Sequence, residues 1–269
     1  MGVLDEIVAH KRVEVERRRA QRPVGDLRAA CRALSPAREF EAVLRPPPAA
    51  TPRVRLIAEV KRASPSRGVL RTGLEPASQA RAYAEAGAAA ISVVTDERYF
   101  HGSLDDLVAV DAAVDRPVLR KEFIVDEYQL WESRAAGADA VLLIVAALEP
   151  PALRDLFHAA KGAGLATLVE AHTAAELEQA LALPARVVGI NNRDLQTLET
   201  DLSVSLRLLP LIPPGPVAVS ESGIFTRAEV ERVVGAGAHA VLVGEALVRA
   251  ADVPAKVREL SLQEGDARW

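Results

Sequence analysis

Cysteine, histidine, lysine and aromatic residues are all scarce in this chain of 269 residues. The single cysteine, Cys31, has no partner for an intramolecular disulfide and cannot build a thiolate metal site. The five histidines lack the spacing of metal ligands, and only His101 and His172 fall in or near loops that follow predicted strands. We therefore expect a cytoplasmic protein that holds no metal.

The chain also lacks a strong charge imbalance and a membrane-length hydrophobic run, and we expect no signal peptide. A net charge of −4 and a pI near 5.8 give no basic footprint, so we expect no nucleic-acid partner. No apolar run is long enough to cross a membrane. Residues 1–19 alternate charge with Leu4, Ile7, Val8 and Val15, which indicates an amphipathic helix. A small-molecule partner is the favoured class.

Three consecutive prolines in AVLRPPPAATPR, residues 42–53, divide the chain into two parts. Residues 1–45 are rich in arginine and helical in pattern, and we predict that they form an extension. We predict that residues 46–269 form the catalytic domain. The apolar stripe of the first helix should pack on that domain, over the site or an adjacent face, because it would otherwise be exposed.

Short apolar runs recur through residues 46–269 at intervals of about 26 residues, the length of a strand, a helix and two loops. Three junctions repeat almost literally, as AGAAAISVV, AGADAVLLI and AGAHAVLVG, each typical of a glycine-capped helix followed by a buried strand. Eight even units favour a (β/α)8 TIM barrel over a doubly wound sheet. The predicted strands are residues 56–60, 90–94, 117–120, 140–145, 166–170, 187–191, 217–221 and 240–244.

Active sites of this fold lie at the carboxyl ends of the strands. The fourth predicted strand ends in apolar residues, which suits an aromatic part of a ligand. The other strand ends carry polar residues and glycines, among them Glu59, Lys61, Ser64, Lys121, Glu170, Asn191, Arg193, Glu221, Ser222, Gly223, Gly244 and Glu245.

The placement of lysine favours chemistry at these ends. Only five of the 33 basic residues are lysine, and two of them, Lys61 and Lys121, follow predicted strands. An ammonium can titrate or point at a substrate in a way that a guanidinium cannot. The alternative is a structural ion pair with Glu59 or Glu170, and Glu170 could equally be a helix-start charge. Two lysines among several carboxylates favour catalysis.

The loops after the seventh and eighth strands favour a phosphate. Gly223 and Gly244 stand at predicted helix starts, where unpaired backbone N–H groups bind anions in barrels of this kind. Plain turns would also explain these glycines, and turn or capping chemistry would explain residues 191–194.

Six motifs together resemble the indole-3-glycerol phosphate synthase family of tryptophan biosynthesis, over essentially the whole chain. The motifs are IAEVKRASPSRG (57–68), LRKEFIVDEYQ (119–129), LVEAHT (168–173), GINNRDL (189–195), SESGI (220–224) and LVGEAL (242–247). The resemblance implies a cofactor-free lyase acting on a phosphorylated small molecule, 1-(2-carboxyphenylamino)-1-deoxyribulose 5-phosphate. Ring closure, decarboxylation and dehydration would give indole-3-glycerol phosphate. We expect a monomer or weak homo-oligomer.

The resemblance also implies roles for individual residues. Lys121 would be the general acid, Lys61 would hold the substrate carboxylate, and Glu170 would be the base or charge stabiliser. We expect Lys61, a like charge, to lower the pKa of Lys121 toward neutrality. Phe123 would pack on the aromatic ring of the substrate. The remaining implied residues are Glu59, Asn191, Glu221 and Ser222 around the chemistry, Arg193 on the anthranilate side, and Ser64, Gly223, Gly244 and Glu245 at the phosphate.

Three other functions are compatible with parts of this pattern. A Schiff-base aldolase would also use a barrel lysine and a phosphate site. Phosphoribosylanthranilate isomerase shares the fold but works with a cysteine, and the predicted barrel has none. A non-catalytic metabolite-binding barrel would keep the phosphate loops without both lysines and Glu170.

Overall fold

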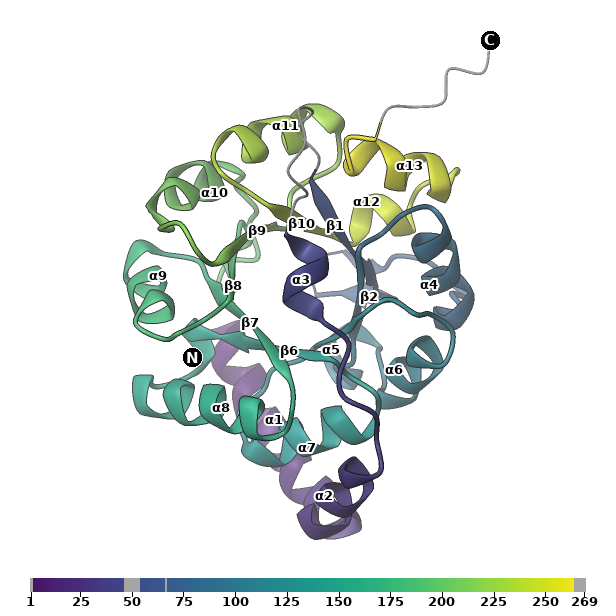
Figure 1. Cartoon of the computed structure of the whole chain (residues 1–269), viewed down its shortest axis with the longest axis vertical. Helices are drawn as coiled ribbons and strands as arrows, with labels where there is room; N and C mark the ends of the chain where they lie inside the picture. The colour runs from purple at the N-terminus through teal and green to yellow at the C-terminus, as the bar shows by residue number, and fades with distance from the viewer. Residues whose placement is uncertain (1, 46–53, 66, 264–269) are drawn as a thin grey trace.

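Eight parallel strands close into a barrel in the order β1-β10-β9-β8-β7-β6-β5-β4 (Figure 1). The structure is a computed structural model that describes residues 2–45, 54–65 and 67–263. The predicted TIM barrel is confirmed, and every predicted strand agrees with the observed one to within one residue at each end. The barrel strands are β1 (Arg55–Val60), β4 (Ala90–Val94), β5 (Val118–Lys121), β6 (Ala140–Ile144), β7 (Ala166–Ala171), β8 (Val187–Asn191), β9 (Val217–Glu221) and β10 (Ala240–Val243).

Helices surround this barrel (Figure 1). Gly87, Gly137 and Gly237, which follow three of them, have φ of 103°, 95° and 111°, a conformation that glycine adopts without strain and that ends a helix sharply. The repeated junctions in the sequence therefore mark real helix ends. The helices are α4 (Pro76–Glu85), α5 (Glu97–Phe100), α6 (Leu104–Asp111), α7 (Glu127–Ala135), α8 (Pro150–Gly162), α9 (Ala174–Leu181), α10 (Ser203–Leu208), α11 (Arg227–Gly235), α12 (Glu245–Val248) and α13 (Val253–Leu260), with 3-10 turns η1 (Val145–Ala147) and η2 (Leu209–Leu211).

The loop after β1 contains a small antiparallel hairpin, β2 (Ala63–Ser64) and β3 (Gly68–Val69). The sequence predicts only a turn here, because strands of two residues are too short to show an alternation of apolar and polar side chains. Ser64, at the end of β2, lines the pocket described below.

The first 45 residues contact both ends of the barrel. They form α1 (Val3–Gln21), α2 (Val24–Arg32) and α3 (Phe40–Leu44). Leu4 and Ile7 of α1 and Phe40 and Leu44 of α3 are buried in one apolar cluster with the inward-facing residues of the barrel strands. Since Leu4 and Ile7 also line a pocket at the carboxyl ends of the strands, α1 lies at the mouth, as predicted. The predicted proline linker lies largely outside the described residues.

The predicted apolar stripe divides between two sites. Val8 packs with Leu4 and Ile7 against the barrel cluster. Val15 instead packs with Leu27 of α2 and Tyr128 of α7, further down the side of the barrel. The helix therefore runs from the mouth to the outer layer.

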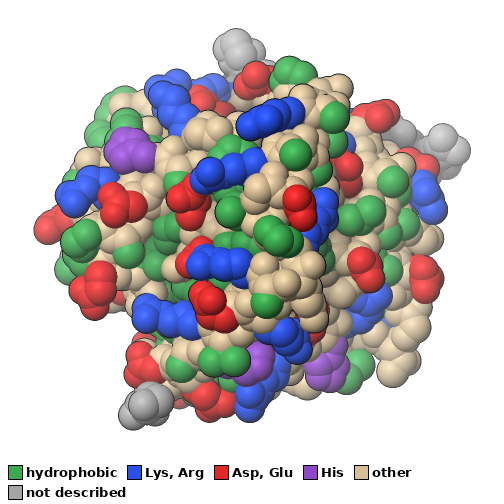
Figure 2. Space-filling model, turned by 90° about the horizontal axis from the view of Figure 1, so that it is seen from below, with side chains coloured by type: hydrophobic (Ala, Val, Ile, Leu, Met, Phe, Trp, Pro, Cys, Tyr) green, Lys and Arg blue, Asp and Glu red, His purple; other side chains and the backbone are tan. Residues whose placement is uncertain are grey.

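Ion pairs join the extension to the barrel helices. Arg18 contacts Glu132 at 3.2 Å, Arg19 contacts Asp126 at 2.6 Å, and Arg28 contacts Glu127 at 2.7 Å. From below Figure 1, on the side of α2 and α7, Lys/Arg and Asp/Glu side chains are interspersed (Figure 2). The two exposed pairs, those of Arg19 and Arg28, contribute little individually, whereas Arg18 and Glu132 are largely buried. Together the three pairs fix the orientation of the extension.

A buried ammonium stands at the centre of the contact between α1 and the barrel. Lys11 Nζ lies 2.9 Å from Asp96 Oδ2, 3.0 Å from Glu122 Oε1 and 3.0 Å from Glu14 Oε2, and its side chain is 1% exposed. Burial alone would lower the pKa of Lys11, but Glu122, Asp96 and Glu14 outweigh it and raise the pKa. Lys11 therefore stays charged, and it ties α1 to the residue that directly follows Lys121.

No helix in the described ranges 2–45, 54–65 and 67–263 has both the length and the apolar character needed to cross a membrane.

We predict that Lys11→Met lowers the free energy of unfolding by about 3–5 kcal/mol, because buried Asp96 loses its cation and Glu122 and Glu14 keep only Arg120 and Arg18. Denaturant unfolding followed by circular dichroism measures this change. Lys161→Met, at an exposed position of α8, is the matched control and should shift stability by less than about 0.5 kcal/mol. Equal effects of the two substitutions would contradict the central place given to Lys11.

Candidate active site

The pocket at the carboxyl ends of the strands collects the residues predicted from the sequence. All of the predicted site residues except Glu221 line it, and Glu221 lies immediately behind the lining. The lining includes Glu59, Lys61, Ser64, Lys121, Phe123, Glu170, Asn191, Arg193, Ser222, Gly223, Gly244 and Glu245, the acids Asp96 and Glu122, and apolar side chains from β6, β10 and the extension.

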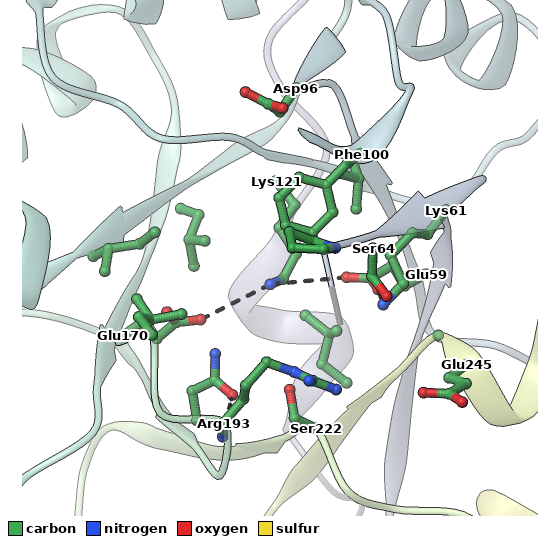
Figure 3. Close-up of a pocket in the computed structure, with 18 of the residues that line it drawn as sticks. Glu59, Lys61, Ser64, Asp96, Phe100, Lys121, Glu170, Arg193, Ser222 and Glu245 are labelled. Carbon is green, nitrogen blue, oxygen red and sulfur yellow. Dashed lines mark hydrogen bonds and ion pairs between the residues drawn. The ribbon is translucent and has the colours of Figure 1, made fainter. Parts of the chain in front are cut away.

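Lys121 occupies the centre of the pocket (Figure 3). Its Nζ lies 3.8 Å from Glu59 Oε2, 3.9 Å from Glu170 Oε2 and 3.9 Å from Glu221 Oε2. These acids come from β1, β7 and β9, so three separate strands aim carboxylates at one ammonium. At 3.8–3.9 Å the contacts are electrostatic rather than short hydrogen bonds, which leaves the Lys121 protons available to another acceptor.

The expected lowering of the Lys121 pKa is wrong. Burial alone would lower it, but the negative charges of Glu170, Glu59 and Glu221 outweigh burial, and the pKa rises above its ordinary value. Arg193 is the cation that opposes this rise. Lys121 is therefore fully protonated at neutral pH.

Glu170 and Glu221 are both buried but differ in pKa. Burial would raise the pKa of Glu170, yet the ammonium of Lys121 and the imidazole of His172 lower it to about 2. The pKa of Glu221 is raised well above its ordinary value, by burial and then by the negative charge of Glu170. Of the two acids, Glu170 is therefore the one that gives up its proton more readily.

Glu59 and Lys61 form the pair that interrupts the apolar run of the first strand. The two residues are two apart, so both side chains project to the same face at the end of β1. Lys61 Nζ lies 2.6 Å from Glu59 Oε1. Burial would raise the pKa of Glu59, but Lys61 and Lys121 lower it. Glu59 thus stays charged between two ammonium groups, with Lys61 and Glu170 on opposite sides of Lys121 (Figure 3).

Two glycines make room for the buried acids. A Cβ at Gly189 of β8 would overlap Glu221 Oε1, and a Cβ at Gly244 would overlap Glu59 Oε1. Neither glycine has a left-handed backbone conformation, so it is the acids that exclude a side chain at these positions.

The opposite wall of the pocket is apolar. Phe123, Ile144 and Leu142 line it, and Phe100 lies beside Phe123 with a ring-centroid separation of 6.2 Å. Sequence reasoning identified Phe123 and the apolar end of the fourth strand but missed Phe100. An aromatic ligand ring fits this wall, with the charged cluster at its edge.

The loops after β9 and β10 form the glycine-rich end of the pocket. Ser222 and Gly223 have φ of 65° and 72°, and Gly244 immediately precedes α12. Gly223 and Gly244 let the backbone approach a ligand closely, which suits an anion bound by backbone N–H groups. Ser64 and Glu245 also line the pocket.

Asn191 and Arg193 approach the pocket from the end of β8. Asn191 Oδ1 accepts a hydrogen bond from the Arg193 amide at 3.0 Å, and Arg193 Nη1 donates to the Leu198 carbonyl at 2.9 Å. These bonds hold the turn after β8 in place, so both side chains have fixed positions.

Sequence reasoning placed His172 near a strand end but gave it no role. His172 Nε2 lies 3.4 Å from Glu170 Oε1, and Nδ1 lies 3.0 Å from Glu176 Oε2. Two signals could have identified it. It stands two residues after Glu170, hence on the same face, and it directly precedes Thr173, which caps α9 with Glu176 three residues further on.

The chain is similar to known proteins over nearly its whole length. Residues 4–260 match the family model described as indole-3-glycerol phosphate synthase. A protein of that name from Roseiflexus sp. (strain RS-1) is 50% identical over 266 residues, covering 96% of this chain and 97% of the relative. Another from Kineococcus radiotolerans is 49% identical over 260 residues, covering 97% of this chain and 95% of the relative.

Solved structures show a likeness of fold alone. A 3-hexulose-6-phosphate synthase from Salmonella typhimurium superposes with a TM-score of 0.62 at 16% identity, covering 78% of this chain and 97% of that chain. The part of the fold that it shares is therefore the barrel architecture.

We predict that Gly189→Ala lowers the free energy of unfolding by about 1–3 kcal/mol, because the new Cβ overlaps the buried Glu221 carboxyl. Combining it with Glu221→Ala should recover part of that loss, since the overlapping atoms are gone. Gly162→Ala, where a Cβ meets nothing within 4 Å, is the control and should be neutral or stabilising. If the stability losses of Gly189→Ala and Glu221→Ala in thermal unfolding are strictly additive in the double variant, the overlap is contradicted.

Proposed function

The chain belongs to the indole-3-glycerol phosphate synthase family, and on that premise we propose how its pocket residues divide the work. The reaction converts 1-(2-carboxyphenylamino)-1-deoxyribulose 5-phosphate to indole-3-glycerol phosphate by ring closure, loss of CO₂ and loss of water. The full-length family match sets aside the aldolase, the isomerase and the non-catalytic barrel. The observation that carries the assignment of roles is the convergence of three carboxylates on Lys121.

Lys121 is the general acid of ring closure. The aromatic ring carbon attacks the ketone carbon, and the carbonyl electron pair moves to oxygen. An ammonium beside that oxygen supplies the proton that prevents a free alkoxide. The raised pKa of Lys121 means that the proton is present throughout the neutral range. The long contacts to its three carboxylates support this role, since they orient the ammonium without consuming its protons.

Glu170 is the base, or charge stabiliser, of the later steps. Loss of CO₂ returns an electron pair to the iminium that ring closure creates. Dehydration then needs a proton for the departing hydroxyl, from Lys121 or Lys61, and an acceptor for the proton that leaves. Glu170 is ionised, buried and on the far side of Lys121 from Lys61, which supports this assignment. Glu59, Asn191, Glu221 and Ser222 orient these groups.

Substrate binding uses both ends of the pocket. Lys61 pairs with the substrate carboxylate, in exchange for part of its contact with Glu59. Phe123 packs against the anthranilate ring, and Arg193 lies on the same side. The phosphate occupies the opposite end, where Ser64, Gly223, Gly244 and Glu245 stand and where backbone N–H groups favour an anion.

The extension, residues 1–45, and the catalytic domain, residues 46–269, act as one unit in this proposal. Leu4 and Ile7 form part of the pocket lining, so the extension contributes to substrate binding as well as to stability. The enzyme works in the cytoplasm as a monomer or weak homo-oligomer, with no nucleic-acid or membrane partner. The net charge of −4 supports the absence of a nucleic-acid partner.

We predict that Lys121→Arg loses on the order of 10²–10⁴ in kcat, the usual contribution of a positioned acid. Arginine keeps the positive charge but does not give up a proton near neutral pH. Lys61→Arg should have a milder effect on kcat and a larger effect on KM, because its role is electrostatic.

Steady-state assays of indole fluorescence, with folding checked by circular dichroism, measure both variants. Lys161→Arg, on the exposed face of α8, serves as the matched control and should retain wild-type kinetics. A Lys121→Arg enzyme within a few-fold of wild type removes Lys121 from the acid role.

We predict that crystals grown in phosphate or sulfate hold an anion at the loops after β9 and β10. It should contact the amides of Gly223, Gly244 or Glu245, where glycines and a helix start favour negative charge. An anion found only elsewhere, with these loops ordered and open, would argue against this phosphate end.

A further inference from the structure

We propose that His172, held as an imidazolium by Glu176, positions Glu170 and keeps it ionised while Lys121 gives up its proton. His172 is a positioning residue, since it lies outside the described lining of the pocket and reaches the chemistry only through Glu170. The inference rests on the proposed role of Glu170 as base and deepens it.

The charge of His172 follows from the geometry of its ring. Nδ1 faces Glu176 Oε2 at 3.0 Å, and Nε2 faces Glu170 Oε1 at 3.4 Å. A neutral imidazole has one N–H and one lone pair, so either tautomer would direct a lone pair at a carboxylate. The Nδ1 contact is a hydrogen bond, whereas the Nε2 contact has the distance of an ion pair without the alignment of a hydrogen bond. Only the imidazolium places positive charge beside both acids. The pKa of His172 agrees, because Glu170 and Glu176 outweigh burial and raise it to about 10.

The orientation of the ring is fixed by the start of α9. Glu176 Oε2 accepts hydrogen bonds from both the His172 backbone amide, at 2.8 Å, and ring Nδ1. Its other oxygen accepts from the Thr173 hydroxyl at 3.2 Å, and Thr173 Oγ1 accepts from the Glu176 amide at 3.2 Å. The residues that cap α9 therefore hold the ring in place, with Nε2 beside Glu170.

The two oxygens of Glu170 have different cations. His172 faces Oε1, whereas Lys121 faces Oε2 at 3.9 Å. This division directs Oε2 toward the pocket and holds Oε1 away from it. It also matters during turnover, because Lys121 becomes neutral when it protonates the substrate oxygen. His172 then remains as a cation on Glu170, so the carboxylate stays a base for the proton released at dehydration.

The charged and titratable groups around His172 come from three elements. Glu170 belongs to β7, Glu176 to α9, and Asp194 follows β8, where the positive charge of His172 contributes to lowering the pKa of Asp194. Lys121 and Glu221 act on Glu170, the acid that lies beside His172. His172 is thus in direct contact with two acids, Glu170 and Glu176, and their negative charges keep its imidazole protonated.

The test compares His172→Asn and Glu176→Gln with wild type in kcat/KM against pH. The neutral amide introduced by His172→Asn removes a cation from Glu170, so the Glu170 pKa rises and the acid limb shifts to higher pH. We expect kcat to fall on the order of tenfold or more, with KM little changed, as for other residues that orient a functional group. Glu176→Gln keeps the acceptor but removes a charge that raises the His172 pKa, so the alkaline limb should shift to lower pH.

Stability gives a second readout of the same charge. The folded pKa of His172, about 10, exceeds its ordinary value of 6.5. Its contribution to the free energy of unfolding is therefore fully present below pH 6.5 and is lost as the pH rises through 10. Wild type should lose more stability than His172→Asn over that interval. Equal losses of stability in wild type and His172→Asn would show that His172 is not an imidazolium.

Controls separate this inference from the role of Glu170. His158→Asn, at an exposed position of α8, should leave the dependence of kcat/KM on pH unchanged. Glu170→Gln should abolish most activity. If Glu170→Gln is inactive while His172→Asn keeps the wild-type kcat and both limbs, the positioning role is wrong and the base assignment stands. If Glu170→Gln is active, the base assignment itself fails.

Discussion

The site depends on one electrostatic balance, that between the Lys121 ammonium and the carboxylates that β1, β7 and β9 direct toward it. Burying these charges separately would be costly, but together they satisfy one another. The balance sets the pKa of each member: those of Glu59 and Glu170 are lowered, and that of Glu221 is raised. Groups that hold and groups that give up a proton can therefore lie within one pocket at the same pH, because their surroundings push their pKa values apart.

The extension completes this site as well as stabilising it. Its first helix supplies apolar lining through Leu4 and Ile7, and its third helix fills the opposite end of the barrel core. Between these contacts, Lys11 neutralises acids that follow β4 and β5. Lys121 and Glu122 are neighbours in sequence and both line the pocket, but their ion pairs differ: Lys121 contacts acids of β1, β7 and β9, whereas Glu122 contacts Lys11 of the extension.

Much of this could be predicted from the sequence, for definable physical reasons. Strands buried on both faces give continuous apolar runs, and glycine caps mark where the helices end, so the barrel was recovered almost residue by residue. The site residues followed from their places at strand ends. The hairpin β2–β3 could not be predicted, because strands of two residues are too short to show the alternation of side chains that marks a strand. The pKa of Lys121 was misjudged because Lys61 is near in the sequence, whereas Glu170 and Glu221 come close to Lys121 only when the barrel closes. Likewise, nothing around Lys11 distinguishes it from a surface cation until α1 docks.

The Lys11 contact also bears on how the chain folds. The carboxylates of Asp96 and Glu122 are desolvated in the native state, and the ammonium that contacts both comes from a helix more than 80 residues earlier. A barrel that closed before this helix docked would leave Asp96 without that ammonium and Glu122 with Arg120 alone. Docking of the first helix and closure of the barrel are therefore coupled steps of one cooperative transition, and the long sequence separation makes that transition slow relative to local helix formation.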